Sequence, residues 1–188
     1  MSKYSYKLTL FALLLTAIFA AAVPRNTAAS APPQISARTI REVRHELATL
    51  PYYGVFDWLQ FQIQPDNTVV LKGQVVRPST KSDAGSRVKD IDGVAKVVNE
   101  IEVLPLSPHD DRLRAALYRS IYGMNSPLFR YATQSVPSIH IIVAGGRATL
   151  KGMAATKSDA QLAYIRARNV PGLFNVKNEL QIESELPQ

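Results

Sequence analysis

Hydrophobic residues recur along the chain with two different periods, and both periods appear in the same order twice. Between residues 40 and 50 they return every three or four positions, as on one face of an amphipathic helix. Over 55–63 and again over 69–75 they alternate with polar residues, which is typical of half-buried strands. The turn-forming sequence Gln-Pro-Asp-Asn at 64–67 separates the two runs and predicts an antiparallel hairpin.

A second helix and a last strand complete this first set of elements. Ala84, Val88 and Ile91 share one helical face, and Gly93 follows at the point where a helix end favours a left-handed residue. Residues 97–103 then alternate again. The predicted order is therefore helix, strand, strand, helix, strand.

The same order returns in the second half of the chain. Helical stripes lie over 113–121 and 160–170, and alternating runs lie over 139–143, 148–150 and 176–182, with a Gly-Gly turn between the first two runs. We therefore expect an α+β protein of two tandem αββαβ units, at 38–105 and 109–184. A small three-stranded mixed sheet with two helices on one face is the simplest packing for each unit.

Residue identities support a duplication. Residues 69–103 align without a gap on 148–182, an offset of 79, and the residues of the first copy that match are Leu71, Lys72, Gly73, Ser79, Ala84, Arg87, Gly93, Val97, Asn99 and Glu100. The pentapeptide Thr-Lys-Ser-Asp-Ala also occurs twice, from Thr80 and from Thr156, but at an offset of 76. We expect each threonine to cap its helix, so that the helix of the second unit begins one turn earlier.

The N-terminal residues predict export. Lys3 and Lys7 precede an apolar run that ends in small residues, so residues 1–22 are interpreted as a cleaved signal peptide and the protein as periplasmic. An uncleaved membrane anchor is the alternative. Residues 23–37, rich in proline and small residues, predict a flexible linker. Cysteine is absent, so packing alone must stabilise the fold.

The second unit carries extra residues, 123–137, between its first helix and its first strand. Leu128, Phe129 and Tyr131 flank Arg130 there, a combination that suits a lipid interface or a protein partner. The alternative is that these aromatic and aliphatic side chains cover the core of their own unit.

Few residues of the chain favour catalysis. The three histidines, His45, His109 and His140, lack the spacing of a metal site, and we expect neither a metal nor another cofactor. Asp110 and Asp111 precede the helical stripe from Leu113, where carboxylates cap a helix and complement its dipole. We therefore expect a protein that is not an enzyme.

Charge points to anionic partners. The formal net charge is +7, and the second half of the chain carries most of the excess that remains without the signal peptide. Export makes nucleic acid an improbable partner, which leaves anionic lipid, cell-wall polymer or an acidic protein surface. We expect contacts to anionic lipid from the arginines of the second unit: Arg112, Arg114, Arg119, Arg130, Arg166 and Arg168. Ordinary solvated positions are the alternative.

The repeated pattern resembles tandem BON domain proteins of the osmotically induced periplasmic type. The positions that carry the resemblance are the Leu-Lys-Gly strand exits and the endings Gly-hydrophobic…Val-x-Asn, namely Gly73, Gly93, Val94, Val97 and Asn99, with Gly152, Gly172, Leu173, Val176 and Asn178. All are interpreted as structural. The extra residues 123–137 depart from the compact family unit.

The resemblance implies a binding protein of the bacterial envelope that contacts anionic phospholipid, with a place in stress response and no reaction. The alternative function is a periplasmic chaperone or assembly factor for outer-membrane proteins, since some family members act as chaperones. In that case Tyr52, Tyr53, Trp58 and the loop 128–131 would hold partner segments.

Overall fold

The computed structural model describes residues 36–185, all of which belong to one compact part of the chain, residues 31–188. The predicted signal peptide, 1–22, and the predicted linker up to residue 35 lie outside the described residues. Among the described helices, none has the length and apolar character to cross a membrane.

The first unit begins with helix α1 (Ala37–Ala48), which starts where the Ser36 hydroxyl accepts a hydrogen bond from the Thr39 backbone amide. Val43 and Leu47 bury the predicted face of this helix. The strands β1 (Trp58–Ile63) and β2 (Thr68–Val75) then pair antiparallel, as predicted.

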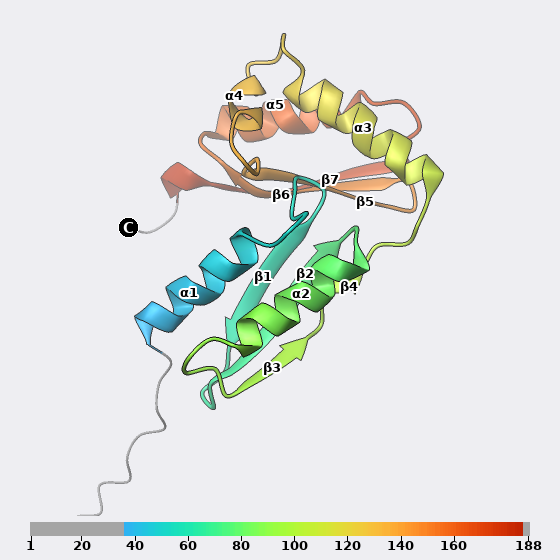
Figure 1. The fold of residues 1–188 in the computed structure, drawn as a ribbon. Coiled ribbons are helices and arrows are strands. Elements are labelled where there is room, and N and C mark those ends of the chain that lie inside the picture. The colour runs from blue at the N-terminus through green and yellow to red at the C-terminus, as the bar shows by residue number, and fades with distance from the viewer. Residues whose placement is uncertain (1–35, 186–188) are drawn as a thin grey trace, which may run out of the picture. The chain divides into compact units, whose positions relative to one another are not determined.

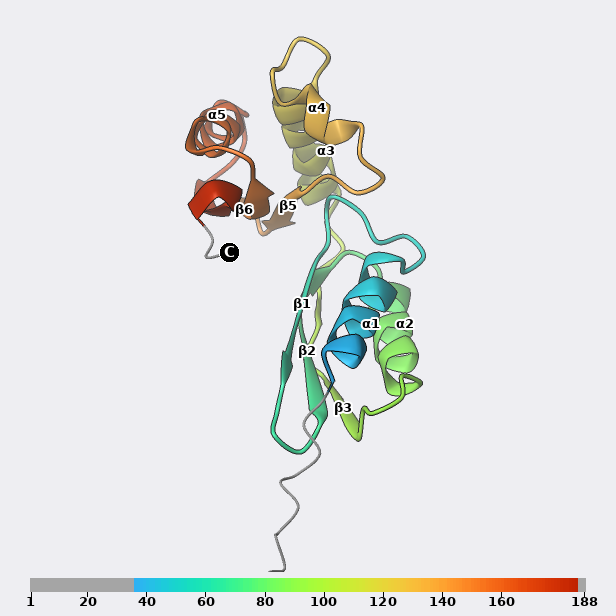
Figure 2. The ribbon, with the colours of Figure 1, turned by 90° about the vertical axis from the view of Figure 1, so that its left-hand side faces the viewer.

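The helix α2 (Pro78–Lys89) connects this hairpin to a third strand that runs parallel to β2. That strand is interrupted after Asn99, so it forms two pieces, β3 (Lys96–Asn99) and β4 (Glu102–Val103). Figure 2 shows α1 and α2 side by side on one face of the sheet. The predicted fold class is confirmed, with β1 at one edge of the sheet and β2 in its centre.

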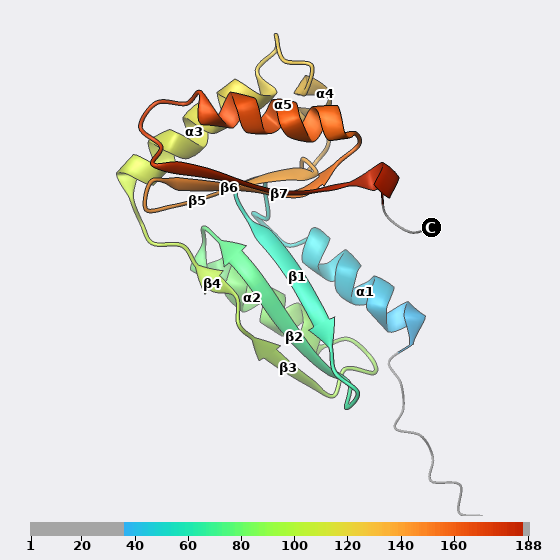
Figure 3. The same ribbon diagram turned by 180° about the vertical axis from the view of Figure 1, so that it is seen from behind.

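The second unit repeats this architecture. Its elements are α3 (Pro108–Tyr122), α4 (Phe129–Ala132), β5 (Ile139–Ala144), β6 (Arg147–Ala154), α5 (Lys157–Arg168), β7 (Asn175–Ile182) and a 3₁₀ turn (Glu183–Glu185). The sheet order is β5-β6-β7, with β6 antiparallel to β5 and parallel to β7. In Figures 1 and 3, α3 and α5 cover the same face of this sheet.

Glycine is required where the return strand bends. Gly73 and Gly152 have φ values of 127° and 99°, and a Cβ atom on them would lie 1.9 Å from the Trp58 carbonyl oxygen and 2.1 Å from the Ser138 carbonyl oxygen. The atom close to Gly73 belongs to the neighbouring strand β1, because Gly73 pairs with Leu59, the residue after Trp58. Both glycines lie inside β2 and β6, and not at the strand exits where the sequence pattern placed them, and the absence of a side chain lets the neighbouring strand approach.

The extra residues of the second unit cover its own core. Leu128 is fully buried and Tyr131 is 5% exposed, and both belong to the hydrophobic cluster beneath α3 and α5. Phe129 and Arg130 remain exposed on α4. The alternative in which this segment covers its own core is confirmed for Leu128 and Tyr131.

The prediction from the repeated pentapeptide was correct for Thr156 and wrong for Thr80. Thr156 precedes α5, and its hydroxyl accepts a hydrogen bond from the Asp159 amide at 3.1 Å. Helix α2 instead begins at Pro78 after Arg77, so Thr80 lies inside its first turn and is buried. Both helices start at the offset of 79 (157 − 78), and the second does not begin a turn earlier.

Candidate binding surfaces

Two arginines lie exposed on α3 without a carboxylate partner among the described residues. Arg112 and Arg119 are seven residues apart, so they occupy the same side of the helix about 10 Å from each other. Ala116 lies between them and packs against the core. This side of α3 therefore presents two unneutralised positive charges to solvent.

A pair of reciprocal hydrogen bonds ties α5 to α3 next to Arg119. The Ser120 hydroxyl donates to the Arg166 carbonyl oxygen at 2.9 Å, and the Arg166 guanidinium donates to the Ser120 carbonyl oxygen at 3.1 Å. Arg168, exposed near the end of α5, stacks over the Tyr164 ring at 5.6 Å. Arg166 is therefore half-buried, and its guanidinium is engaged by the Ser120 carbonyl oxygen.

Arg114 does not contribute to this surface. It is 4% exposed, donates a hydrogen bond to the Val143 carbonyl oxygen at 2.7 Å and forms an ion pair with Asp111 at 2.6 Å. Its guanidinium is therefore committed to the edge strand β5, contrary to the prediction that it faces a membrane.

Arg130 is exposed but neutralised. It forms an ion pair with Asp159, which also accepts a hydrogen bond from the Tyr131 hydroxyl at 2.8 Å. Burial opposes ionisation of Asp159, but hydrogen bonds from Tyr131, Thr156 and Arg130 outweigh it, and the pKa of Asp159 is lowered. The carboxylate is held ionised, and Arg130 serves to fix α4 onto the start of α5.

Asp110 has a different role from the predicted one. The capping residue of α3 is Ser107, whose hydroxyl accepts from the Asp110 amide at 3.2 Å. The buried Asp110 carboxylate instead accepts hydrogen bonds from Gly145 and Gly146, at 2.9 and 2.8 Å. Their positive φ values, 56° and 72°, turn both amides toward it, so Asp110 fixes the β5–β6 hairpin to α3.

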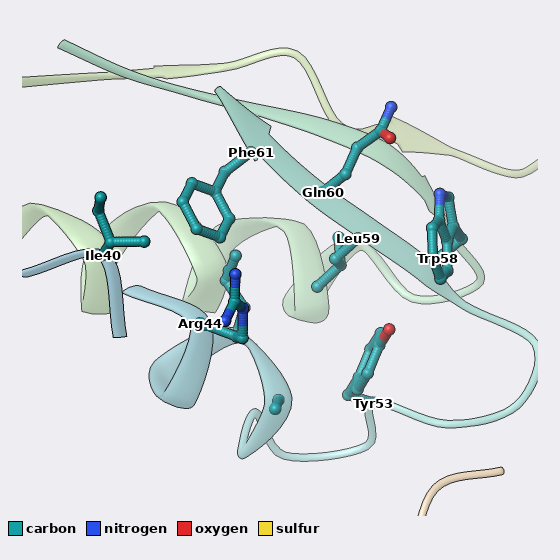
Figure 4. Close-up of a pocket in the computed structure, with 9 residues that line it drawn as sticks. Ile40, Arg44, Tyr53, Trp58, Leu59, Gln60 and Phe61 are labelled. Atoms are coloured by element: carbon teal, nitrogen blue, oxygen red, sulfur yellow. The ribbon is translucent and has the colours of Figure 1, made fainter. Parts of the chain in front are cut away.

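A groove of 450 Å³ lies between α1 and the edge strand β1, and it is here called the α1–β1 groove. Ile40, Arg44 and Leu47 line it from α1, and Leu59 and Phe61 line it from β1. Figure 4 shows the side chains of Arg44 and Phe61 pointing toward each other across it. Arg44 is exposed and forms no ion pair with any described carboxylate, so the groove combines an apolar floor with one free positive charge.

Aromatic residues close one end of the groove and contact the second unit. Tyr53 and Trp58 both line the groove, and their rings lie 5.7 and 5.1 Å from the His140 ring. Burial raises the pKa of Tyr53 to about 12, an effect that a hydrogen bond with the Leu59 backbone partly offsets. Burial also lowers the pKa of His140, against the opposing effect of the Asp57 and Gly54 backbone carbonyls.

The other two histidines, His45 and His109, are exposed, and the described residues include no cluster of metal-ligating side chains. Sequence reasoning missed the α1–β1 groove, because Arg44 and Phe61 are separated by the turn that follows α1. It also placed Val55 in the first strand, whereas Val55 packs into the core of the second unit.

Comparison with known families decides what the two repeats are. The family described as BON domain matches this chain twice, over residues 41–105 and 128–184. The chain belongs to the BON domain family. Proteins with BON domains are typically found in the bacterial envelope, and the family is not known for catalysis, so the chain is an envelope-related binding module.

The remaining comparisons add little. Two solved structures of CdsD, a structural protein of the type III secretion system of Chlamydia trachomatis, are similar to the chain at 13% identity. One match covers 79% of this chain and 94% of CdsD with a TM-score of 0.29, and one to the CdsD C-terminal domain covers 81% and 100% with a TM-score of 0.30. Such scores carry no argument about function. No curated protein matches the chain.

The predicted structural positions act alike in both BON domains. Gly93 and Gly172 each have a φ of 90° after the second helix of their domain. The Asn99 side chain accepts a hydrogen bond from the Ile101 amide at 3.2 Å, and the Asn178 side chain accepts one from the Leu180 amide at 3.1 Å. Asn99 also donates to the Lys81 carbonyl oxygen of α2 at 2.7 Å.

The second BON domain differs from the first in the segments that cover its hydrophobic core. The family match resumes at residue 128, so α3 lies outside the matched residues. The loop 128–131, proposed from the sequence as part of a chaperone surface, has its two largest core-facing side chains, Leu128 and Tyr131, buried. It therefore offers only Phe129 and the paired Arg130 to a partner.

Proposed function

We propose that the chain is a non-enzymatic module of the periplasmic face of the cell envelope that binds anionic phospholipid through α3 and α5. One observation carries the proposal. The acidic residues of these two helices are all engaged: Asp110 by glycine amides, Asp111 by Arg114 and Asp159 by Arg130.

The exposed arginines of the same helices have no such partner. Arg112, Arg119 and Arg168 are exposed, and none of them has a described carboxylate within ion-pair distance. Arginines near an anionic membrane each contribute about 1 kcal/mol of binding free energy. Together, these residues suit a weak, salt-sensitive attachment to lipid phosphates.

An exposed apolar residue accompanies the charges. Ile165, which precedes Arg166 in α5, is 47% exposed. Aliphatic side chains next to arginines are typical of helices that lie in the interface between headgroups and acyl chains. Ile165 is therefore the residue of α5 best suited to enter the headgroup region.

Co-sedimentation of the full chain with vesicles tests the proposal. Vesicles of phosphatidylcholine with phosphatidylglycerol should bind the chain, vesicles of phosphatidylcholine alone should not, and added salt should weaken binding. The double substitution Arg112→Gln/Arg119→Gln should lower the partition constant about 30-fold, because two charges contribute about 2 kcal/mol.

A charge-matched control is the double substitution Arg38→Gln/Arg41→Gln, which removes two exposed arginines from α1 of the first BON domain. Its partition constant should stay within about twofold of the parent, since α1 lies outside the proposed surface. Equal losses for both double variants would show that net charge alone governs binding and would contradict the assignment to α3 and α5.

A further inference from the structure

The loop that follows α5 exposes a large aromatic side chain. Phe174 is 77% exposed, and it lies in the segment that connects α5 to β7. Its neighbour Leu173 packs against the hydrophobic core of the second domain, whereas the Phe174 ring lies outside this cluster of described residues. The loop therefore turns one apolar side chain inward and the next one toward solvent.

The neighbouring hairpin turn holds Phe174 in this position. The Phe174 amide donates a hydrogen bond to the Gly146 carbonyl oxygen at 2.8 Å. The ring lies against Gly146 itself, since a Cβ atom on that glycine would be 2.7 Å from two carbon atoms of the ring. Gly146 is fixed in turn by the buried Asp110 carboxylate, which accepts a hydrogen bond from its amide at 2.8 Å. One side of the ring is thus supported by a fixed turn, while most of its surface remains in water.

The first BON domain shows that the fold does not require an aromatic residue at this position. By the offset of 79, Phe174 corresponds to Ala95, which is exposed as well. The Ala95 amide donates to the Asn67 carbonyl oxygen at 3.0 Å, which is the counterpart of the hydrogen bond between Phe174 and Gly146. Alanine is therefore sufficient for the structure here, and the phenyl ring of the second domain adds an apolar group to the surface.

Two exposed arginines flank Phe174. Arg147 follows Gly146 in the hairpin and pairs in register with Asn175, the residue after Phe174. Arg168 lines the same hollow as Phe174, a space of 310 Å³ beside the end of α5. Neither arginine has a carboxylate within ion-pair distance among the described residues. The aromatic ring is therefore bordered by two positive charges that are not neutralised.

The equivalent turn of the first domain has the opposite charge. By the same offset, Arg147 corresponds to Thr68, which is buried and donates a hydrogen bond to the Asp66 carboxylate at 3.0 Å. Asp66 itself corresponds to Gly145. The hairpin turn thus carries a carboxylate in the first domain and an arginine in the second, so only the second domain combines an exposed aromatic ring with a basic turn.

An aromatic ring between arginines suits the surface of an anionic bilayer. Aromatic side chains concentrate at the boundary between headgroups and acyl chains, and surface-bound proteins bury apolar side chains about 5–10 Å into this boundary. Arginines beside such a ring remain at the level of the headgroups, where they pair with lipid phosphates. The charge of Arg147 and Arg168 therefore selects an anionic membrane as the partner of Phe174.

We propose that Phe174 inserts into the headgroup region of anionic membranes, with Arg147 and Arg168 bound to lipid phosphates beside it. This inference rests on the lipid-binding function proposed above. It adds an insertion point after the end of α5 to the surface formed by α3 and α5, and Arg168 belongs to both. Attachment then depends on apolar contact as well as on charge.

A tryptophan introduced at position 174 tests the insertion directly. Trp58 is the single tryptophan of the chain, so the double substitution Trp58→Phe/Phe174→Trp reports on this position alone. Its emission should shift to shorter wavelength on vesicles of phosphatidylcholine with phosphatidylglycerol, and phospholipids with brominated acyl chains should quench it. The matched control, Trp58→Phe/Phe129→Trp, places the reporter on α4 at a residue that is 41% exposed, and brominated chains should leave its emission unquenched.

Co-sedimentation with the same vesicles gives a measurement that keeps Trp58. Phe174→Ala should lower the partition constant about tenfold, as expected when one phenyl ring is no longer partly buried, and should leave the salt dependence unchanged. Arg147→Gln should lower the partition constant about fivefold and weaken the salt dependence. Leu106→Ala removes a side chain that is 93% exposed between the two domains, and this control should bind like the parent. Because alanine occupies the equivalent position 95, the unfolding midpoint of Phe174→Ala should match that of the parent.

The outcomes separate this inference from the proposed function. A parent chain that does not bind the anionic vesicles would refute both. Binding that Phe174→Ala leaves unchanged, or a tryptophan at position 174 that brominated chains do not quench, would refute the insertion alone. Equal losses for Leu106→Ala and Phe174→Ala would also refute it, since any exposed apolar residue would then serve. The same holds for emission that shifts with protein concentration without vesicles, because a second copy of the chain would then cover the ring.

Discussion

The two copies of Thr-Lys-Ser-Asp-Ala allow one substitution to be tested in two structural settings. The Thr80 side chain is buried in α2, and its hydroxyl has no hydrogen-bond partner among the described residues. The Thr156 side chain is exposed and caps α5 through the Asp159 amide. Replacement of each threonine by valine removes the hydroxyl and keeps the branched shape, so the two variants should change stability in opposite directions.

The magnitudes follow from the two settings. Thr156→Val loses a helix cap, which costs about 1 kcal/mol of unfolding free energy. Thr80→Val removes a buried hydroxyl without a partner, and we expect a gain of about 1 kcal/mol, at the low end of the penalty for such groups. Threonine and valine have similar helix propensities, so the backbone contributes little to the difference of about 2 kcal/mol.

Thermal and urea unfolding of the full chain, followed by circular dichroism, would measure this difference. For a chain of this size, 1 kcal/mol corresponds to about 2–4 °C in Tm, so the two variants should differ by about 4–8 °C. The exposed serines of the two pentapeptides, Ser82 and Ser158, supply controls, and Ser82→Ala and Ser158→Ala should each stay within about 0.5 kcal/mol of the parent. Equal destabilisation by both valine variants would refute the reasoning, because Thr80 would then need its hydroxyl.

Three further changes probe the same framework. Gly152→Ala should cost more than about 3 kcal/mol in chemical denaturation, since its Cβ would lie 2.1 Å from the Ser138 carbonyl oxygen. Gly54→Ala should cost far less, since its Cβ would lie 3.9 Å from the Tyr52 carbonyl oxygen. Asp110→Asn should cost about 1.5–3 kcal/mol of unfolding free energy in the same assay, because the amide of Gly145 or Gly146 loses its charged acceptor. A loss below about 0.5 kcal/mol would show that the β5–β6 hairpin is stable without this carboxylate. Burial lowers the folded-state pKa of His140 below its unfolded value of about 6.5. The contribution of His140 to stability is therefore complete above about pH 6.5 and is lost as the pH falls through the folded pKa. His140→Gln should flatten this part of the profile of unfolding free energy against pH.

The repeated architecture could be predicted because it rests on local signals. The period of apolar residues fixed which face of each helix is buried, and Gly93 and Gly172 marked the turns where φ is 90°. Such signals depend on the covalent backbone and on neighbours within a few residues. They therefore persisted through duplication even where most other residues changed.

The candidate surfaces depended on partners distant in sequence, and these could not be predicted. Arg114 has the sequence surroundings of a surface arginine, yet the Val143 carbonyl oxygen and Asp111 hold it in the interior. Asp110 was expected to cap its helix, but the positive φ values of Gly145 and Gly146 turn two amides toward its carboxylate. In each case a contact made only by the folded chain determines the role of the side chain.

Val55 shows why the two BON domains should not share one binding surface. Its alternation with its neighbours suited the first strand, but that strand begins at Trp58, and Val55 completes the core of the other domain. The second domain uses this segment and Leu128 to cover its core. This segment covers the edge of β5 at Ile141, whose amide donates a hydrogen bond to the Val55 carbonyl oxygen at 2.8 Å. The first domain supplies this segment, and its own α1–β1 groove is open.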